Sequence, residues 1–166
     1  MPSLGISSGI AATNKFRKLS SVGNNTWSSD TEDWLGVNAN VSQSSGQLLV
    51  EATASLGYAQ KIFNVDAGAT YIAKVTRHYT IAANYSTFAS FGAFNTDTGA
   101  ALGSTLNVST DATSLLQFSF LAENTVQVSI RLITVTNSKT TEWDDFSLAE
   151  EGVYLWEAWF QQLWAI

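Results

Sequence analysis

The chain has 166 residues, of which 45% are hydrophobic and 12% aromatic, so it can build one substantial core. A net charge of −6 and a total of eight Lys and Arg argue against binding to nucleic acid, because phosphate contacts need clustered basic side chains. The absence of cysteine excludes disulfide bridges and thiolate metal sites, so packing must hold the core together.

Residues 1–21 are predicted to form a polar N-terminal arm. This segment has neither a basic leader nor a long apolar run, so it does not have the pattern of a secretory signal. Its basic residues Lys15, Arg17 and Lys18 fall within four positions. They either face solvent or form a docking site for an acidic partner.

Residues 46–148 show an alternation of apolar and polar positions that is typical of antiparallel β-structure. Turn residues divide this region into seven predicted strands, QLLVEATA, YAQKIFNV, TYIAKVTRHYTI, TFASFGAF, LLQFSFLA, TVQVSIRLITV and TEWDDFSL. One or two further strands are expected near Trp27 and Trp34. We therefore predict an all-β fold, an antiparallel jelly-roll β-sandwich of eight to nine strands over residues 22–150.

The alternation also assigns side chains to the core or to solvent. In TVQVSIRLITV, one side is apolar and is expected in the core, whereas Arg131 lies on the polar side with Gln127 and Ser129. The apolar side carries Val126, Val128, Ile130 and Leu132. In TEWDDFSL, Asp144 has the parity of Phe146 and is expected to point inward, where a carboxylate needs calcium, an arginine or turn amides as a partner. Trp143 has the opposite parity and is expected on the solvent face.

The order of several segments resembles a known family. The segments are SSDTEDWLG, SGQLLVEA, YAQKIFNVDAGATYIAKV and WDDFSL, and over residues 22–149 they resemble the carbohydrate-binding-module-like, galactose-binding-like jelly roll found in phage virion proteins and bacterial surface proteins. The resemblance implies a non-catalytic domain that binds glycans or serves as a structural or adhesive module. It also implies a structural calcium ion at Asp144 or Asp145, and a core role for Trp34.

Candidate glycan-binding residues are aromatic side chains that lie on the solvent face or in a loop. They are Trp143, Tyr79, Tyr85 and Phe88, and each has burial under a loop as its alternative. The single histidine, His78, has no evident partner for a metal site or a catalytic triad. Adjacent acids such as Asp144 and Asp145 point to opposite faces of a strand, whereas a glycosidase needs two carboxylates across one cleft, so we expect no enzyme.

The C-terminal segment, residues 151–166, changes to a spacing of three and four that predicts a short amphipathic helix. Its apolar stripe consists of Trp156, Trp159, Phe160, Leu163 and Trp164. The segment is too short to span a bilayer, and the acidity of the chain disfavours an anionic membrane surface. The stripe is expected to dock into a neighbouring subunit, and the alternative is that it folds back onto its own sandwich.

These features together suggest a non-catalytic structural module of a larger assembly. The expected protein is a phage virion component, such as a capsid decoration, neck or tail-fibre protein, that is homo-oligomeric and assembled in the host cytoplasm. The alternative is an extracellular carbohydrate-binding module that recognises a cell-surface or plant-type polysaccharide. The two differ in their partners, which are other virion subunits in the first case and a glycan in the second.

Overall fold

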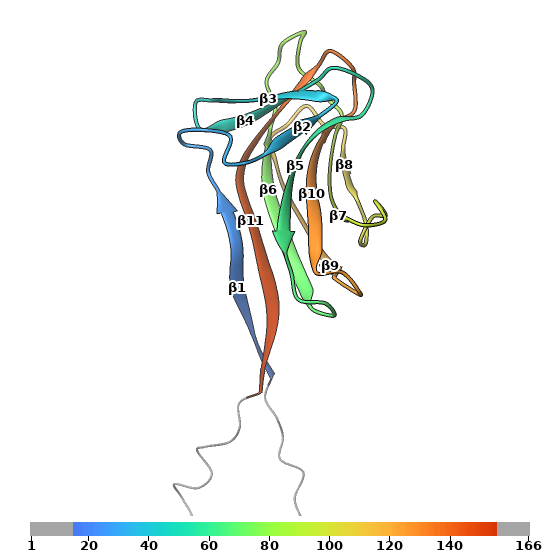
Figure 1. The fold of residues 1–166 in the computed structure, drawn as a ribbon. Helices are drawn as coiled ribbons and strands as arrows, with labels where there is room; N and C mark the ends of the chain where they lie inside the picture. The colour runs from blue at the N-terminus through green and yellow to red at the C-terminus, as the bar shows by residue number, and fades with distance from the viewer. Residues whose placement is uncertain (1–14, 156–166) are drawn as a thin grey trace, which may run out of the picture.

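The computed structural model describes the backbone of residues 15–155 and the side chains of residues 22–151. These residues form eleven strands and no helix (Figure 1). The strands are β1 (Lys15–Asn25), β2 (Leu35–Val37), β3 (Ala39–Ser44), β4 (Gln47–Ala52), β5 (Gly57–Asn64), β6 (Thr70–His78), β7 (Ala89–Asn95), β8 (Leu106–Val108), β9 (Ser114–Leu121), β10 (Gln127–Thr134) and β11 (Thr140–Leu155).

The strands form two antiparallel sheets with a shared core. The first sheet has the order β3-β4-β11-β6-β9, with β1 also paired to β11, and the second has the order β2-β5-β10-β7-β8. The predicted all-β class is therefore confirmed, and the strand count exceeds the expected eight to nine. Strand β2 follows Trp34 and β1 ends close to Trp27, where one or two further strands were expected. The additional strands β3 and β8 are polar or short, so hydrophobic patterning did not mark them.

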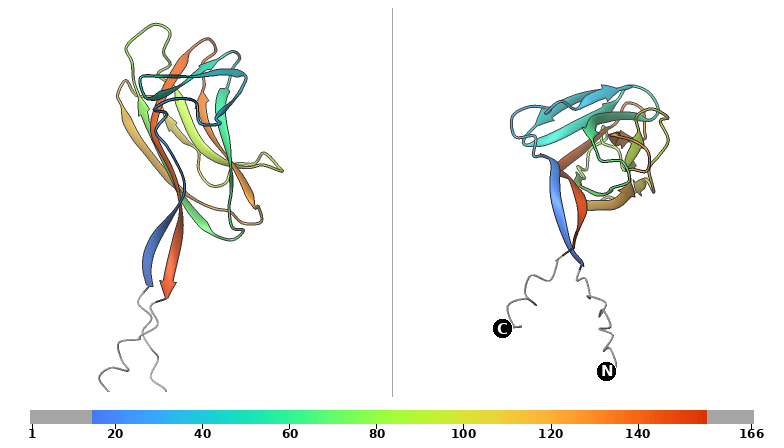
Figure 2. Two further views of the ribbon diagram at one scale, coloured as in Figure 1. Left: turned by 60° about the vertical axis from the view of Figure 1, so that its left-hand side comes forward. Right: turned by 60° about the horizontal axis from the view of Figure 1, so that its bottom comes forward.

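The long strand β11 connects two parts of the first sheet. Its first residues pair with β4, its later residues pair with β1, and β6 runs along its other side as far as Glu150. Beyond that point β1 and β11 continue as a two-stranded ribbon that projects from the sandwich (Figure 2). The expected boundaries at residues 21 and 150 thus fall inside strands that cross them.

The basic residues of the predicted arm lie in strand β1. In its pairing with β11, Lys15 faces Leu155, Arg17 faces Val153 and Lys18 faces Gly152. The aromatic stripe of the predicted C-terminal helix lies outside the described residues. Docking by that stripe therefore stays a prediction.

The core is built from the inward positions of both sheets and is rich in aromatic rings. Trp34 and Phe146 meet edge to face with ring centres 5.2 Å apart, and Trp27 lies 5.8 Å from Trp34. Phe91 of the second sheet meets Phe118 of the first at 4.9 Å. Edge-to-face contacts at these distances are favourable for aromatic pairs, and Trp34, which is 2% exposed, has the core role expected of it.

A β-bulge in β11 reverses the alternation that the sequence predicts there. Asp144 pairs with Thr76 of β6, but the next pair joins Ser147 to Lys74, so two residues of β11 face one residue of β6. Asp145, at the bulge, has a φ of 51°. One extra residue changes the face of every side chain that follows it.

Two expectations about this strand are wrong because of the bulge. Trp143 points inward with 0% exposure, and its Nε1 donates to Thr141 Oγ1 at 2.8 Å, so it does not offer a surface to a glycan. Asp144 points outward, where its Oδ2 lies 3.7 Å from Nε2 of His78. His78 consequently has a partner that the sequence did not reveal.

Candidate functional site

The second sheet carries an unusual set of side chains on the side away from the core. The alternating residues of its strands, such as Ala59, Phe91 and Ile130, belong to the core, so the residues between them point outward. We call this set the outward face. It comprises Leu35 and Val37 of β2, Tyr58, Gln60, Ile62 and Asn64 of β5, Gln127, Ser129, Arg131 and Ile133 of β10, Ser90, Gly92 and Phe94 of β7, and Asn107 of β8.

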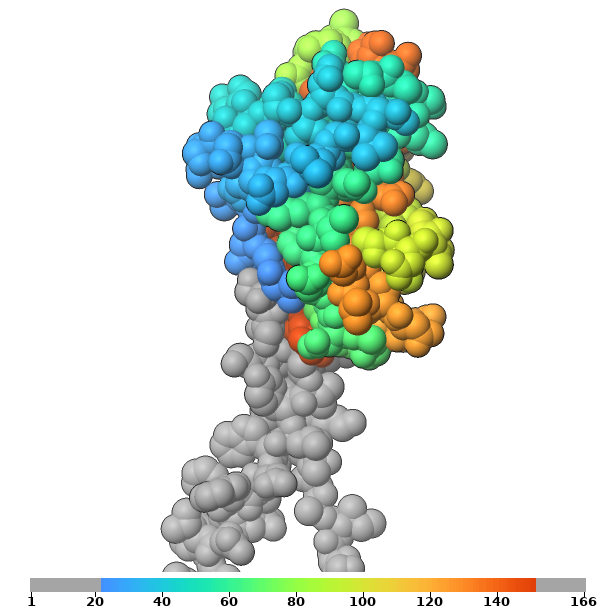
Figure 3. All heavy atoms as spheres, viewed as in Figure 1, coloured from blue at the N-terminus to red at the C-terminus, as the bar shows by residue number. Residues whose placement is uncertain are grey.

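The register brings these residues into rows across the sheet. Arg131 lies between Gln60 and Gly92, and the next row places Ser129 between Ile62 and Phe94. Strands β5 (green) and β10 (orange) lie side by side on the surface that faces the viewer in Figure 3. Side chains from three neighbouring strands therefore meet on one surface.

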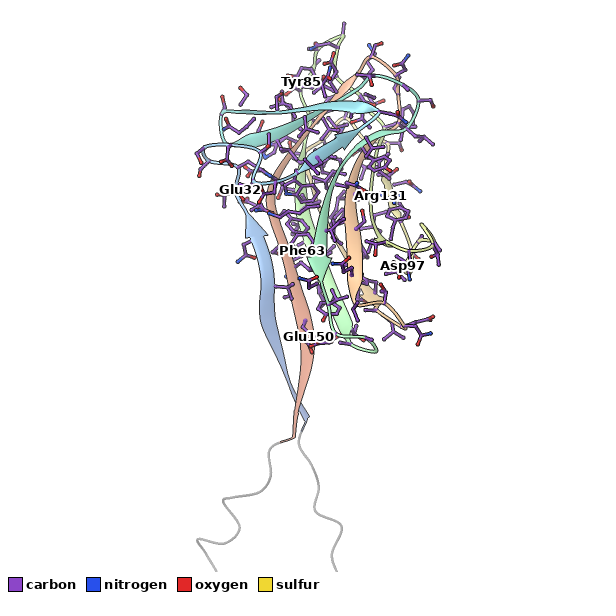
Figure 4. The ribbon with its side chains drawn as sticks, in the orientation of Figure 1. Glu32, Phe63, Tyr85, Asp97, Arg131 and Glu150 are labelled. Carbon is purple, nitrogen blue, oxygen red and sulfur yellow. The ribbon has the colours of Figure 1, made fainter. Side chains whose placement is uncertain are left out.

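Arg131, which is labelled in Figure 4, lies close to two aromatic rings on this face. Its guanidinium carbon is 4.8 Å from the ring centre of Tyr58 on β5 and 4.2 Å from that of Phe94 on β7. A guanidinium at such distances is attracted to the electron-rich face of a ring. The arrangement holds the arginine side chain over the sheet between the two flanking strands.

Polar side chains surround this cluster in hydrogen-bonded pairs. Ser129 Oγ donates to Gln60 Oε1 at 3.0 Å, and Ser90 Oγ donates to Asn107 Oδ1 at 2.6 Å. Each amide group has further donors and acceptors beyond the one used in its pair. The pairs therefore orient amides that can still bind hydroxyl groups of a ligand.

Apolar side chains complete the outward face. Leu35 is 66% exposed and Ile62 is 53% exposed, and both belong to strands on the β5 side of Arg131. On the other side, a Cβ at Gly92 would come within 3.1 Å of both Phe94 Cε2 and Thr105 Oγ1. Glycine at this position thus allows Phe94 and Thr105 to approach the strand closely.

The other aromatic residues predicted for glycan binding lie in residues 79–88, which connect β6 to β7. Arg77 at the end of β6 is 1% exposed and ties this loop to residues 109–113. Its Nη1 donates to Thr110 O at 2.8 Å, and its Nη2 donates to Ser86 O at 2.5 Å. Burial lowers the pKa of this guanidinium, and Tyr79, Asp111 and Glu142 oppose that shift.

Within this loop the three candidates differ in exposure. Tyr79 is partly buried, with its ring centre 5.1 Å from the Arg77 guanidinium carbon. Tyr85 is also partly buried, and burial together with the neighbouring Glu142 carboxylate raises its pKa. Phe88 is 52% exposed and precedes β7. The structure therefore does not join Tyr79 and Tyr85 to the outward face, and a glycan role for this loop stays a prediction.

The calcium site that the family resemblance implies at Asp144 or Asp145 stays a prediction. Asp144 contacts His78, and the backbone N–H of Asp145 donates to Asp144 Oδ1 at 2.7 Å. In the part of the chain that the structure describes, no group of three or more His, Asp or Glu side chains could hold a metal ion. The same part contains no helix that is long and apolar enough to cross a membrane.

Comparison with known proteins identifies the fold. No family model and no curated protein matches the chain. Among solved structures, it is similar to the CBM22-1 xylan-binding domain of Xyn10C from Paenibacillus barcinonensis, with a TM-score of 0.60, 13% identity, and 82% of this chain and 97% of that chain covered. It is also similar to the C-terminal family 22 carbohydrate-binding module of Xyn10B from Clostridium thermocellum, with a TM-score of 0.58, 18% identity, and coverage of 81% and 96%.

A tandem of two such modules from the Paenibacillus protein has a TM-score of 0.64 at 11% identity, with 92% of this chain and 49% of that chain covered. The fold is therefore that of the carbohydrate-binding modules, and the predicted resemblance is confirmed. Because the sequence identities are this low, the similarity shows a shared fold and does not show a shared function. The virion setting and the homo-oligomer remain predictions from the sequence.

Two aromatic residues of the outward face, Tyr58 and Phe94, were not among the site residues predicted from the sequence. Arg131 was correctly predicted on the polar side of its strand. The available signal was the alternation in YAQKIFNV and TFASFGAF, which gives Tyr58 and Phe94 the parity opposite to Ala59 and Ala93. What was missing was the strand order, which places β10 between β5 and β7.

Proposed function

We propose that the chain is a carbohydrate-binding module that binds a polysaccharide on the outward face of its second sheet. The observation that carries this proposal is the cluster of Tyr58, Phe94 and Arg131, surrounded by amides and hydroxyls, on a fold shared with carbohydrate-binding modules. This reading was the alternative in the sequence analysis. It replaces the virion role as the function that the geometry supports best.

The chemistry of the face suits a sugar. A pyranose ring has an apolar side of C–H groups that can pack on an aromatic ring, and a rim of hydroxyls that need hydrogen-bond partners. Tyr58 and Phe94 provide rings, while Gln60 provides an amide in the row between them. Ligand sites generally combine such apolar surface with a few placed polar groups.

The distribution of acids supports binding without cleavage. Glycoside hydrolysis requires two carboxylates on either side of the scissile bond. None of the residues that make up the outward face is an aspartate or glutamate. A glycan on this face would therefore be held rather than hydrolysed, which suits a module that keeps an extracellular surface or particle in contact with a polysaccharide.

The proposal is tested by measuring saturable binding of the full chain to a broad glycan array, followed by titration with the best ligand. Tyr58→Ala and Phe94→Ala should each weaken binding by about tenfold or more, equivalent to about 1.4 kcal/mol or more. Leu115→Ala is the matched control, because Leu115 is 67% exposed on β9 of the other sheet. The Leu115→Ala variant should bind the glycan with the same affinity as the unmodified chain.

Two results would count against this function. The first is the absence of saturable binding to any glycan on the array. The second is a glycan that binds with equal affinity to the unmodified chain and to both aromatic variants, since its site would then lie elsewhere.

A further inference from the structure

Most of the lysine and arginine side chains that the structure describes are engaged in the protein's own structure. Among the residues with described side chains there are five, Lys61, Lys74, Arg77, Arg131 and Lys139. Three of them donate to backbone carbonyls, Arg77 as described above, Lys61 to Glu32 O at 2.7 Å, and Lys139 to Ala83 O. Arg131 is different, because it lies at the centre of the outward face without such a bond.

The hydrogen-bonding groups of Arg131 are largely free. Its Nε lies 3.4 Å from Ser129 Oγ, which is a long hydrogen bond, and its two Nη atoms have no acceptor among the described residues. The contacts with Tyr58 and Phe94 place the guanidinium carbon over the two rings. A cation–π contact gives the Nη donors no oxygen acceptor, so these donors are available to a ligand.

The surroundings of Arg131 favour an anion. The outward face has no carboxylate, so within it Arg131 is an uncompensated positive charge, although the whole chain has a charge of −6. A carboxylate fits the guanidinium edge through two parallel hydrogen bonds, which are shorter and stronger than those to a neutral hydroxyl. A neutral sugar would leave this charge unmatched.

We propose that the polysaccharide bound by the outward face is acidic, and that Arg131 binds the carboxylate of a uronic-acid residue. This inference rests on the proposed function and adds the chemical class of the ligand. The sugar ring packs on Tyr58 or Phe94 while its carboxylate accepts from the Nη atoms of Arg131. Gln60, in the same row as Arg131, is placed to bind a neighbouring hydroxyl.

The test compares ligands that differ in the carboxylate alone. Calorimetric titration of the full chain would use oligosaccharides from polygalacturonate, alginate and glucuronoxylan, each beside its carboxyl-reduced, neutral counterpart. We expect at least one acidic ligand to bind about tenfold or more tightly than its reduced form. The difference should shrink as ionic strength rises, because exposed charges are screened by salt.

Variants of Arg131 separate the role of charge from that of shape. Arg131→Gln should remove the preference for the acidic ligand, and Arg131→Lys should retain part of it, because lysine keeps the charge and loses the two-pronged geometry. Lys74→Gln is the matched control, since it removes one positive charge from β6 in the other sheet. Thermal unfolding of each variant confirms that it is folded.

The outcomes distinguish this inference from the proposed function. Equal binding of acidic and reduced ligands, unaffected by Arg131→Gln, would overturn the inference and leave glycan binding intact. Binding of dextran sulfate in preference to every uronide would overturn the carboxylate assignment. The absence of binding to any glycan, acidic or neutral, would overturn both.

Discussion

Arg77 and Arg131 lie in different sheets, and each contacts an aromatic ring, yet their environments are opposite. Arg77 points inward, is 1% exposed and donates to backbone carbonyls of two loops. Arg131 points outward and lies between two rings, and its Nη atoms find no acceptor in the described part of the chain. An arginine side chain thus stabilises loops at position 77, where backbone carbonyls accept its hydrogen bonds. At position 131 no carbonyl of the described residues accepts from its Nη atoms, and the side chain is available to a ligand.

The aromatic residues around them show the same contrast. In the core, Phe91 and Phe146 meet other rings edge to face, so their surfaces are fully used by the protein. On the outward face, Phe94 and Tyr58 meet a cation and remain partly exposed. We therefore expect substitutions in the first region to change stability, and those in the second to change binding.

The largest effect is expected from deleting Asp145, because the bulge alone keeps both Trp143 and Phe146 inside. Removal of one residue would turn either the segment before it or the segment after it to the wrong face. We expect loss of cooperative thermal unfolding, measured by circular dichroism. Asp145→Gly is the control, since glycine suits the φ of 51° and should change the free energy of unfolding by about 1 kcal/mol or less. A deletion variant as stable as the unmodified chain would contradict the account of the bulge.

The next largest effect is a difference in the free energy of unfolding between variants of two phenylalanines in the same strand, β7. Phe91→Ala should lower the free energy of unfolding by about 3–5 kcal/mol, because Phe91 is 0% exposed in the core. Phe94→Ala should lower it by about 1 kcal/mol or less and should weaken glycan binding instead. Urea unfolding of both variants measures the difference. Equal destabilisation would show that the outward face is part of the folding core.

The two arginines provide a similar pair. Arg77→Met should lower the free energy of unfolding by about 3 kcal/mol, because hydrogen bonds from a charged group contribute about 1.5–3 kcal/mol each and some of the freed carbonyls can reach water. Arg131→Met should change it by about 1 kcal/mol or less, which is the scale of an exposed cation–π contact. If Arg131→Met proved the more destabilising, the proposal that Arg77 serves stability and Arg131 serves ligand binding would be wrong.

The smallest effect concerns Tyr71 and alkaline pH. Burial raises the pKa of the Tyr71 hydroxyl, and the carboxylates of Glu150 and Asp66 raise it further, while the hydrogen bond from the Asp66 N–H at 2.7 Å lowers it. The folded state therefore keeps this proton to higher pH than the unfolded state, whose tyrosines ionise near pH 10. Stability from this group is present below pH 10 and is lost as the pH rises toward the folded pKa.

Tyr71→Phe tests this dependence. At neutral pH the variant should be less stable by about 1 kcal/mol, because it lacks the hydrogen bond to Asp66. The difference in melting temperature between the two proteins should narrow from pH 9 to pH 11. A difference that is constant over this range would show that ionisation of Tyr71 is not linked to folding.

The sequence predicted much of the sandwich but little of the site. The pattern in TVQVSIRLITV correctly placed Val128, Ile130 and Leu132 in the core and Arg131 outside. It was wrong for Val126, which precedes β10 and is 66% exposed. In TEWDDFSL it failed, because a bulge depends on how a strand pairs with its neighbour and leaves no mark in the hydrophobic pattern. Strand β3, ANVSQS, was missed for a related reason, since its polar residues gain their order from pairing with β4.

By itself the sequence determined the all-β class and the face of most side chains within each strand, because alternation is a local property of a chain with a repeat of two. The tertiary structure decided which strands are neighbours, and so which side chains meet. Tyr58, Phe94 and Arg131 are distant in the chain and come together because β10 pairs with both β5 and β7. Long-range pairing also decided that backbone carbonyls accept hydrogen bonds from Arg77, whereas none accepts from the Nη atoms of Arg131 in the described part of the chain.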